Sequence, residues 1–522
     1  MKTFRGAWPL AGLVAGFAGL ATSYLVAMAM SIRESPVVAV GELVIRYTPG
    51  DVAERAIGLL GFWDKPALLI GIFVVLGVLF AYAGRLARTS WSWALIVFGL
   101  LGGVGAAAVA LRPDTTIASY LPVAVGFVTW LVCLSILTEP LRVTTTTDAA
   151  ATPNREGAPT GTDETADASR RAFLVRAGIL AGLAILAGGA GRLVSRGRRQ
   201  LEETRRLLKL TGVTEPLVPK AARIGVPGIT PWQTQNDDFY LIHTAIVTPT
   251  IEPREWSLRI HGMVDREVVL TYEDLLDRRR TEAWITLSCV SNRVGGDLVG
   301  NAWWGGVRLA DLLGEAGVHA DADAVLQTSE DGWNCGTPLA ALTDDRDAML
   351  ALAMNGRPLP IDHGFPVRTI VPGLYGFVSA CKWVVDMEVT RFDRIQAYWT
   401  GKGWAEQGPV KIASRIDVPS SGDEVTAGDV TFGGVAWHQH TGIRGVEISL
   451  DGGDWQDADV ASGPTDDTWV QWAITTPVEP GDHLVKVRAT GKEGEVQTGV
   501  ERDVLPDGAT GHHQVDFTAE PG

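Results

Sequence analysis

The sequence predicts a chain of several domains: an all-α transmembrane region of about five helices, a mixed α+β domain and a C-terminal β-sandwich. At 522 residues the chain is too long for a single hydrophobic core, so two or more domains are expected. The hydrophobic fraction of 46% is high for a soluble protein, and the excess lies in roughly the first 200 residues. From about Val418 the sequence changes to short alternating apolar runs separated by turns, which is the pattern of a β-sandwich.

Apolar runs near the ~20-residue length that spans a bilayer predict the membrane part. Four of them place a four-helix transmembrane region at residues 1–142. A fifth, from about Phe173 to Ala190, predicts another transmembrane helix at residues 171–195. The four runs are about Trp8 to Met30, Ala67 to Tyr82, Trp91 to Leu111 and Tyr120 to Leu137.

Two segments without long apolar runs join these parts. Residues 143–170 are rich in Thr, Ala, Asp, Pro and Gly, so we expect a flexible linker there. Residues 196–235 form a connector, in which Leu201 to Leu210 predicts a short charged helix and Pro- and Gly-rich sequence follows.

Basic residues indicate which side of the membrane each loop faces. When the N-terminus is cytoplasmic, the basic residues before the first run, after the second, and between the fourth and fifth all lie on the cytoplasmic side. This arrangement puts the C-terminal half outside. A basic group after the fifth run works against this assignment. The supporting residues are Lys2, Arg5, Arg85, Arg88, Arg142, Arg170 and Arg171, and the opposing ones are Arg196, Arg198 and Arg199.

The segment Ser169–Leu174, SRRAFL, looks like a twin-arginine export signal, since a weakly hydrophobic, Gly- and Ala-rich run follows it. An ordinary basic flank before a membrane span is the plainer alternative. A twin-arginine route transports domains that have already folded. We therefore predict a multi-pass protein of the cytoplasmic membrane with its C-terminal half on the extracytoplasmic side.

Charge and histidine content argue against two classes of function. The net charge of −15 gives nucleic-acid binding no electrostatic basis. No His precedes His243 and no Cys-x-x-Cys-His occurs, so the spans lack the ligands for a bis-His haem and no haem is expected.

Cys289 lies in the stretch around which the C-terminal half is organised. An apolar run from Trp284 to Leu287 predicts a buried strand, and Cys289 lies where that strand gives way to a turn-rich segment. A thiol at a strand end is rigidly held yet faces loops, which suits a metal ligand. A buried Cys acting as a small hydrophobe is the alternative. Among the three cysteines of this half one thiol is left over from any disulfide, and pairing of Cys335 with Cys381 stays open.

Two ordered motifs resemble the sulfite oxidase family of molybdopterin enzymes. The first, Ser288–Arg293 followed by Trp304–Leu309, resembles the family's molybdenum-cysteine segment. The resemblance covers roughly Phe239 to the C-terminus. The second motif comprises Met354–Pro360, His363–Arg368, Val371–Gly373, Gly376 and Lys382–Trp383.

The resemblance implies both fold and cofactor. It implies an α+β molybdopterin-binding domain at residues 236–415 and an immunoglobulin-like β-sandwich at 416–522, which in this family often makes homodimer contacts. It also implies a molybdenum–molybdopterin cofactor with Cys289 as the sole protein ligand to the metal, and thiolate sulfur is a soft ligand suited to that role.

Further residues are implied in cofactor binding. His363 and Arg368 lie in a constrained loop that can aim an imidazole and a guanidinium at one anionic ligand, and Lys382 adds a third cationic contact. For each of these, a solvated charge is the alternative, and for Asp331 a simple Asp-Gly turn. The full set is Asn236, Tyr240, His243, Thr328 or Asp331, His363, Arg368, Ala380, Cys381 and Lys382.

The implied reaction exchanges an oxygen atom with a small substrate and passes electrons to or from an external carrier. Arg293 is the candidate for substrate attraction, with pairing to a nearby carboxylate as the alternative. Leu241 and Leu352 occupy positions where sulfite oxidases carry an Arg and a Tyr. We therefore predict a small oxyanion or an S- or N-oxide as substrate, without assigning sulfite. A non-enzymatic, membrane-anchored binding or adhesion module is the alternative function.

Overall fold

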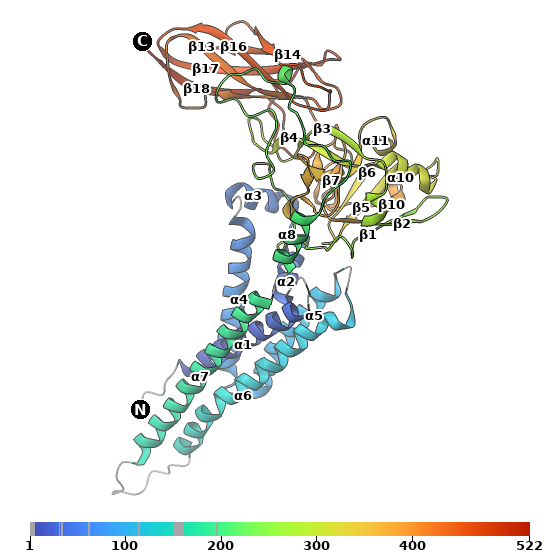
Figure 1. The fold of residues 1–522 in the computed structure, drawn as a ribbon. Helices are drawn as coiled ribbons and strands as arrows, with labels where there is room; N and C mark the ends of the chain where they lie inside the picture. The colour runs from blue at the N-terminus through green and yellow to red at the C-terminus, as the bar shows by residue number, and fades with distance from the viewer. Residues whose placement is uncertain are drawn as a thin grey trace. The chain divides into compact units, whose positions relative to one another are not determined.

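The structure, a computed structural model, describes residues 6–30, 32, 35–60, 63–112, 115–149, 161–194 and 197–522. The chain divides into two compact units. One consists of residues 1–200 with 244–248, and the other of residues 201–243 with 249–522. Figure 1 shows the first unit as helices and the second as mainly β-structure.

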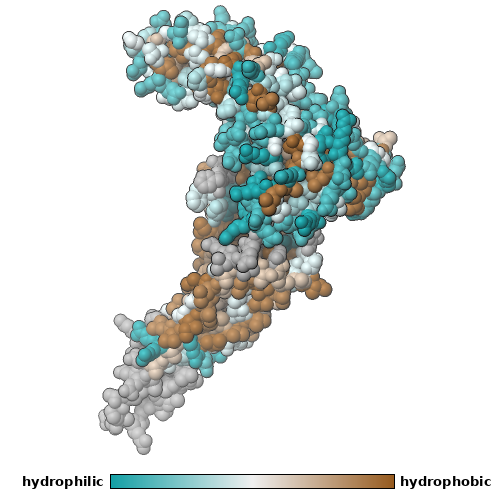
Figure 2. Space-filling view, in the orientation of Figure 1, coloured by the Kyte–Doolittle hydropathy of each residue, from teal (hydrophilic) through white to brown (hydrophobic). Residues whose placement is uncertain are grey.

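The first unit is all helical. Within the described residues five helical segments are long and apolar enough to cross a membrane, which confirms the predicted number: Ala7–Ala29, Asp64–Leu86, Trp91–Ala110, Ile117–Arg142 and Ala168–Ala190. Figure 2 shows apolar residues over much of the visible surface of this unit. Its α-helices are α1 (Ala7–Ala29), α2 (Pro36–Tyr47), α3 (Gly50–Leu60), α4 (Asp64–Leu86), α5 (Trp91–Ala110), α6 (Leu121–Ala149) and α7 (Gly161–Val194).

Glycine and aromatic residues pack these helices together. A Cβ on Gly12 would collide with the backbone of Phe80, so α1 and α4 approach closely only because Gly12 lacks a side chain. The rings of Phe98 and Trp130 stack at 5.3 Å between centroids, and the Trp130 indole donates a hydrogen bond of 2.8 Å to the carbonyl of Gly16. These contacts join α1, α4, α5 and α6.

The helices differ from the sequence expectation in two places. Helix α6 continues to Ala149 and α7 begins at Gly161, so parts of the predicted linker 143–170 are helical, while residues 150–160 lie outside the described ones. Thr and Ala residues can extend an existing helical hydrogen-bond ladder, which composition alone does not reveal. Helix α2 was not predicted, because its 12 residues are too few to span a bilayer.

Helix α8 (Gly197–Leu207) crosses the division between the units and begins and ends a few residues before the predicted charged helix Leu201 to Leu210. The second unit contains two five-stranded sheets. One has the order β2-β1-β10-β5-β6, and the other the order β3-β4-β7-β8 with β9 paired to β7. The strands are β1 (Ser257–Gly262), β2 (Val268–Thr271), β3 (Thr281–Ser288), β4 (Val299–Arg308), β5 (Ala324–Ser329), β6 (Asn334–Pro338), β7 (Met349–Met354), β8 (Arg357–Pro358), β9 (Arg368–Ile370) and β10 (Val384–Thr390).

Short helices cover and connect these sheets. Helix α9 begins after Thr271, whose hydroxyl accepts a hydrogen bond from the Asp274 amide while the Asp274 carboxylate accepts one from the Thr271 amide. Helix α10 ends at a left-handed Gly317, a conformation that glycine adopts readily. The helices are α9 (Tyr272–Leu276), α10 (Leu309–Ala316), α11 (Leu339–Thr343) and α12 (Gly376–Ser379).

The C-terminal lobe is built from eight strands around a separate apolar core. They follow the order β11-β13-β16-β15-β14-β17-β18-β12, and β15 changes partner, pairing with β14 at Gln456–Ala458 and with β16 at Asp459–Val460. Strand β11 begins at Ala413, so it lies across the predicted boundary at residue 416. The strands are β11 (Ala413–Val418), β12 (Glu424–Thr426), β13 (Gly428–Trp437), β14 (Ile443–Leu450), β15 (Gln456–Val460), β16 (Val470–Val478), β17 (Gly481–Gly491) and β18 (His513–Glu520).

Candidate active site

Cys289 directly follows β3 and is held at both ends of its backbone. Its amide donates to the carbonyl of Leu298 at 2.9 Å, and its carbonyl accepts a hydrogen bond of 3.1 Å from the Asn292 amide. The Asn292 side-chain oxygen accepts a further bond of 3.0 Å from the Leu298 amide. Residues 289–298 therefore form a loop closed on itself, and Cys289 is 9% exposed within it. A rigidly placed, nearly buried thiol fits the predicted ligand role.

Two phenols lie near Cys289. Burial raises the pKa of Tyr240, a charge on Cys289 raises it further, and Arg368 opposes the rise. Burial raises the pKa of Tyr375 to about 12. A hydrogen bond from the Lys411 amide acts to lower this pKa, and a charge on Cys289 acts to raise it. Both phenols therefore stay protonated at neutral pH and keep a proton to donate. Tyr240 was predicted; Tyr375 was not, and its only sequence signal is an aromatic residue between two glycines of the second motif.

Arg368 is a buried cation that lacks a carboxylate partner among the described residues. It is 2% exposed, and its guanidinium donates to the His363 carbonyl at 3.1 Å and lies 5.3 Å from the centre of the Trp304 ring. Its Nε makes no hydrogen bond. Burial lowers the pKa of Arg368 to about 10, so the side chain stays charged at neutral pH. A buried, uncompensated charge of this kind calls for an anionic ligand.

Lys382 lies beside Arg368, because the two backbones form an antiparallel bridge. Its ammonium group donates to the Asp362 carbonyl at 2.9 Å. Gly364 makes this closeness feasible, since a Cβ there would lie 2.9 Å from the Arg368 Cβ and 3.2 Å from the Lys382 Cα. The second motif therefore gathers two cations, as predicted.

His363 differs from the prediction that it meets an anion. Its Nε2 lies 3.1 Å from the carbonyl of Asn236, and because a carbonyl only accepts, Nε2 must carry the proton. Burial, followed by the charges of Lys382 and Arg368, lowers the pKa of His363 to about 3. The ring is therefore neutral, with Nδ1 a buried acceptor that makes no hydrogen bond. It suits an N–H donor of a ligand rather than a phosphate.

Several other predicted residues surround these groups. The side chain of Asn236 is engaged with Met354 and Asn355, so this residue acts on the site through the carbonyl that holds His363. The ring of His243 packs edge-on against Trp383 at 5.7 Å, next to Lys382. Ala380 is buried at the end of α12.

Cys381 is fully buried beside Cys335, and both remain thiols. Burial raises the pKa of the Cys381 thiol, and a hydrogen bond with Cys335 raises it further. The side chain of Cys381 therefore faces Cys335, and its backbone is engaged with Thr369, whose hydroxyl accepts from the Cys381 amide at 2.8 Å and whose amide donates to the Cys381 carbonyl at 3.0 Å.

The alternative candidates Thr328 and Asp331 lie in β5 and in the turn that follows it. Asp331 accepts a hydrogen bond of 3.1 Å from the Trp333 amide, which is the plain turn given as the alternative. Thr328 lies in β5, paired with Asp386 and Asn334. The next residue, Ser329, has a buried hydroxyl that makes no hydrogen bond, and no sequence signal distinguished it.

Arg293 lines a depression beside Cys289 that opens to solvent. Its side chain is exposed, and within the described part of the chain no carboxylate forms an ion pair with it. The alternative of a structural ion pair is therefore not observed. The lining of this shallow depression comes from both the half that holds the two five-stranded sheets and the C-terminal lobe, and it includes Ser288, Arg293, Tyr375, Ser414, Gln497 and Thr510.

The residues present fit a large anionic metal cofactor. Arg368 and Lys382 supply positive charge, His363 supplies an unmet acceptor, and Cys289 supplies a soft ligand for a transition metal. These features define a cofactor-dependent redox enzyme.

Comparisons with known proteins identify the family. Residues 244–399 match the model of the oxidoreductase molybdopterin binding domain. The chain is 32% identical over 180 residues to the uncharacterized oxidoreductase YuiH of Bacillus subtilis, covering 34% of this chain and 87% of that relative. It is 28% identical over 302 residues to human mitochondrial sulfite oxidase, covering 49% of this chain and 55% of that protein. The chain belongs to the sulfite oxidase family and is a molybdopterin-dependent oxidoreductase.

The likeness covers only part of some relatives. The chain spans about half the length of the mammalian sulfite oxidases that it matches. Among solved structures, the sulfane dehydrogenase SoxCD of Paracoccus pantotrophus matches with a TM-score of 0.46 and 23% identity, covering 57% of this chain and 82% of that one.

Proposed function

We propose that this protein is a membrane-anchored, extracytoplasmic oxidoreductase that transfers an oxygen atom to or from a small oxyanion or an S- or N-oxide. In this proposal it exchanges electrons with an external redox carrier. The single observation that carries the proposal is the nearly buried Cys289 at the end of β3, followed in the same loop by Arg293, which lines a solvent-open depression. Family membership supports an enzyme over the alternative of a binding or adhesion module.

The molybdenum cofactor, when bound, supplies the redox chemistry of oxygen-atom exchange. Cys289 would hold the metal through its sulfur. Arg368 and Lys382 would bind the anionic part of the pterin, and the neutral His363 would accept a hydrogen bond at Nδ1 from a ring N–H. Because this polar cradle is already assembled, little reorganisation is needed when the cofactor enters.

The side chains around the depression would handle the substrate. Arg293 faces solvent and would attract an anion, while the buried phenol of Tyr375, which also lines the depression, would donate a hydrogen bond to oxygen. Leu352 is fully buried in β7 and cannot reach the depression, and Leu241 is 47% exposed. Because both positions carry leucine, they lack the polar groups of sulfite oxidases, so the proposal does not assign sulfite as the substrate.

A substrate panel tests this proposal. The full chain, purified in detergent from a host that makes the cofactor, should contain about one molybdenum per chain. It should turn over at least one oxyanion or S- or N-oxide with an artificial electron donor or acceptor. A molybdenum-loaded protein that is inactive on every member of the panel, in both directions, would contradict the proposed reaction.

The extracytoplasmic location rests on the basic loops and on Arg170 and Arg171. Replacing both by Lys should keep the C-terminal half in the cytoplasm, where an external protease cannot reach it. The matched control is Arg198→Lys with Arg199→Lys, a second Arg-Arg pair that lies outside the SRRAFL segment. Normal external cleavage of the first variant would refute the export signal.

The C-terminal lobe is proposed to be an immunoglobulin-like sandwich that makes homodimer contacts. Support comes from the family resemblance and from one apolar core formed by both halves of the strand path, with Phe432 and Trp472 contributed by one half and Val487 and Phe517 by the other. The mass of the detergent-solubilised full chain tests the dimer, and a monomer at micromolar concentration would oppose it.

A further inference from the structure

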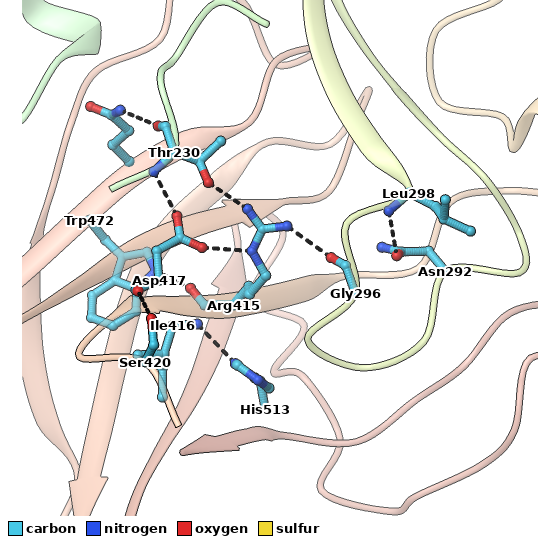
Figure 3. A network of polar contacts seen from close by, with 11 residues as sticks. Thr230, Asn292, Gly296, Leu298, Arg415, Ile416, Asp417, Ser420, Trp472 and His513 are labelled. Carbon is cyan, nitrogen blue, oxygen red and sulfur yellow. Dashed lines mark hydrogen bonds and ion pairs between the residues drawn. The ribbon is translucent and has the colours of Figure 1, made fainter. Parts of the chain in front are cut away.

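The loop that follows Cys289 is held from outside by the C-terminal lobe. Inside the loop, the Gly296 amide donates to the Arg293 carbonyl at 2.9 Å. On its outer side, the Arg415 guanidinium donates to the Gly296 carbonyl at 2.8 Å. Figure 3 shows this bond reaching from β11 to the loop. Gly296 thus contacts Arg415 through its carbonyl and Arg293 through its amide.

Arg415 is the centre of a larger network. Its Nε forms an ion pair of 2.7 Å with Asp417, and its Nη2 donates to the Thr230 hydroxyl at 2.7 Å. Asp417 in turn accepts a hydrogen bond of 2.9 Å from the Thr230 amide (Figure 3). The side chains of Arg415 and Asp417 are only 11% and 9% exposed, so these charge-assisted bonds are shielded from solvent. The guanidinium uses a different nitrogen for each of its three partners, and its rigid planar fork fixes their relative positions, which the single ammonium nitrogen of a lysine cannot do.

A second contact supports the loop on the adjacent residue. Gly295 has a φ of +75°, and a Cβ there would collide with the ring of His513. His513 is fixed in its turn, because its Nδ1 accepts a hydrogen bond of 3.0 Å from the Ile416 amide. The lobe therefore contacts the loop through β11 and β18 at consecutive glycines.

We propose that Arg415 is a positioning residue for substrate capture and that it acts by fixing the loop that carries Arg293. This inference rests on the proposed function, since it assigns Arg293 to an anionic substrate. The loop has no regular secondary structure between β3 and β4, so its shape depends on the few bonds named above. Without the bond to Gly296, the loop loses its charge-assisted tie to the lobe, and Arg293 samples more orientations.

The test compares two arginines that have the same local arrangement. Arg415 pairs with Asp417, and Arg391 pairs with Asp393 at 3.0 Å and also donates to a backbone carbonyl, that of Asp321. The variants are Arg415→Met and Arg391→Met in the full chain. Arg415→Lys is a third variant, which keeps the charge beside Asp417 but cannot supply the fork of donors.

Two readouts are combined. Hydrogen exchange at the Gly296 and Leu298 amides is measured on cofactor-free protein, so it does not depend on catalysis. Arg415→Met should speed this exchange at least tenfold and raise KM for an anionic substrate about tenfold while kcat changes less than about threefold. Arg391→Met should leave the amide exchange and the KM unchanged. Arg415→Lys should fold normally and, like Arg415→Met, show faster exchange and a higher KM for the anionic substrate.

The outcomes separate this inference from the proposed function. Unchanged loop exchange in both Arg415 variants overturns the inference, whatever the activity. Faster exchange with equal losses in kcat for anionic and neutral substrates also overturns it, because the role would then lie outside anion capture. If the unaltered enzyme turns over no member of the panel, the proposed function fails, and the exchange data still decide whether Arg415 fixes the loop.

Discussion

Arg368 and His363 are joined by one hydrogen bond, from the guanidinium Nη1 to the His363 carbonyl at 3.1 Å, and each side chain keeps one buried nitrogen without a partner. The arginine nitrogen is a donor and the imidazole Nδ1 is an acceptor. Unmet buried groups cost stability, so a site that retains both fits a ligand that satisfies them. The molybdopterin cofactor of this family is such a ligand, because it offers both anionic oxygens and ring N–H groups.

Arg368→Met should reduce the molybdenum content of the purified protein roughly tenfold, because the buried cation for the cofactor is lost. The cofactor-free variant should be as stable as the unaltered apoprotein or more stable, by ~1 kcal/mol, since an uncompensated charge is removed from the interior. Metal analysis and thermal unfolding measure the two effects. Arg357→Met, an exposed residue of the same motif, is the control. Full molybdenum content in Arg368→Met would show that another group carries the binding.

His363 should remain neutral far below the usual pH for histidine. Its pKa of about 3 in the folded state lies below the ordinary value of 6.5, so the unfolded chain binds the extra proton first as pH falls. The contribution of His363 to the free energy of unfolding is therefore complete above pH 6.5 and decreases from there toward pH 3. NMR of ¹³C-labelled imidazoles in the apoprotein, assigned with His363→Asn, should show no titration between pH 8 and about 4. A midpoint near 6.5 would contradict the burial of the ring beside Lys382 and Arg368.

Arg293→Met should raise KM for an anionic substrate about tenfold and leave kcat within about twofold, because the lost interaction acts on capture rather than on the reaction itself. The salt dependence of kcat/KM should also become weaker. A neutral S-oxide should be converted with unchanged parameters. Arg444→Met, an exposed change on β14, is the control. An equal effect on charged and neutral substrates would remove Arg293 from anion attraction.

Much of this architecture could be predicted from local sequence. The membrane helices follow from length and hydropathy, and Cys289 was placed correctly at a strand end because an apolar run stops one residue before it. The two cations Arg368 and Lys382 were found through the second motif, and the structure adds that their backbones pair.

Properties set by tertiary contacts could not be predicted. The neutral state of His363 depends on burial and on Lys382 and Arg368, and the carbonyl of Asn236, 127 residues earlier in the chain, sets which ring nitrogen carries the proton. Cys381 faces Cys335 because β6 and the segment after α12 come together only in the fold. Arg415 and Tyr375 carry no motif of their own, and their importance follows solely from what lies beside them.

X-ray absorption at the molybdenum edge tests most directly whether the Cys289 sulfur binds the metal. Cys289→Ser, isolated with metal still bound, should show one sulfur neighbour fewer than the unaltered enzyme and should lose turnover. An identical number of sulfur neighbours in both proteins, or full activity in the variant, would contradict the assignment of Cys289 as the molybdenum ligand.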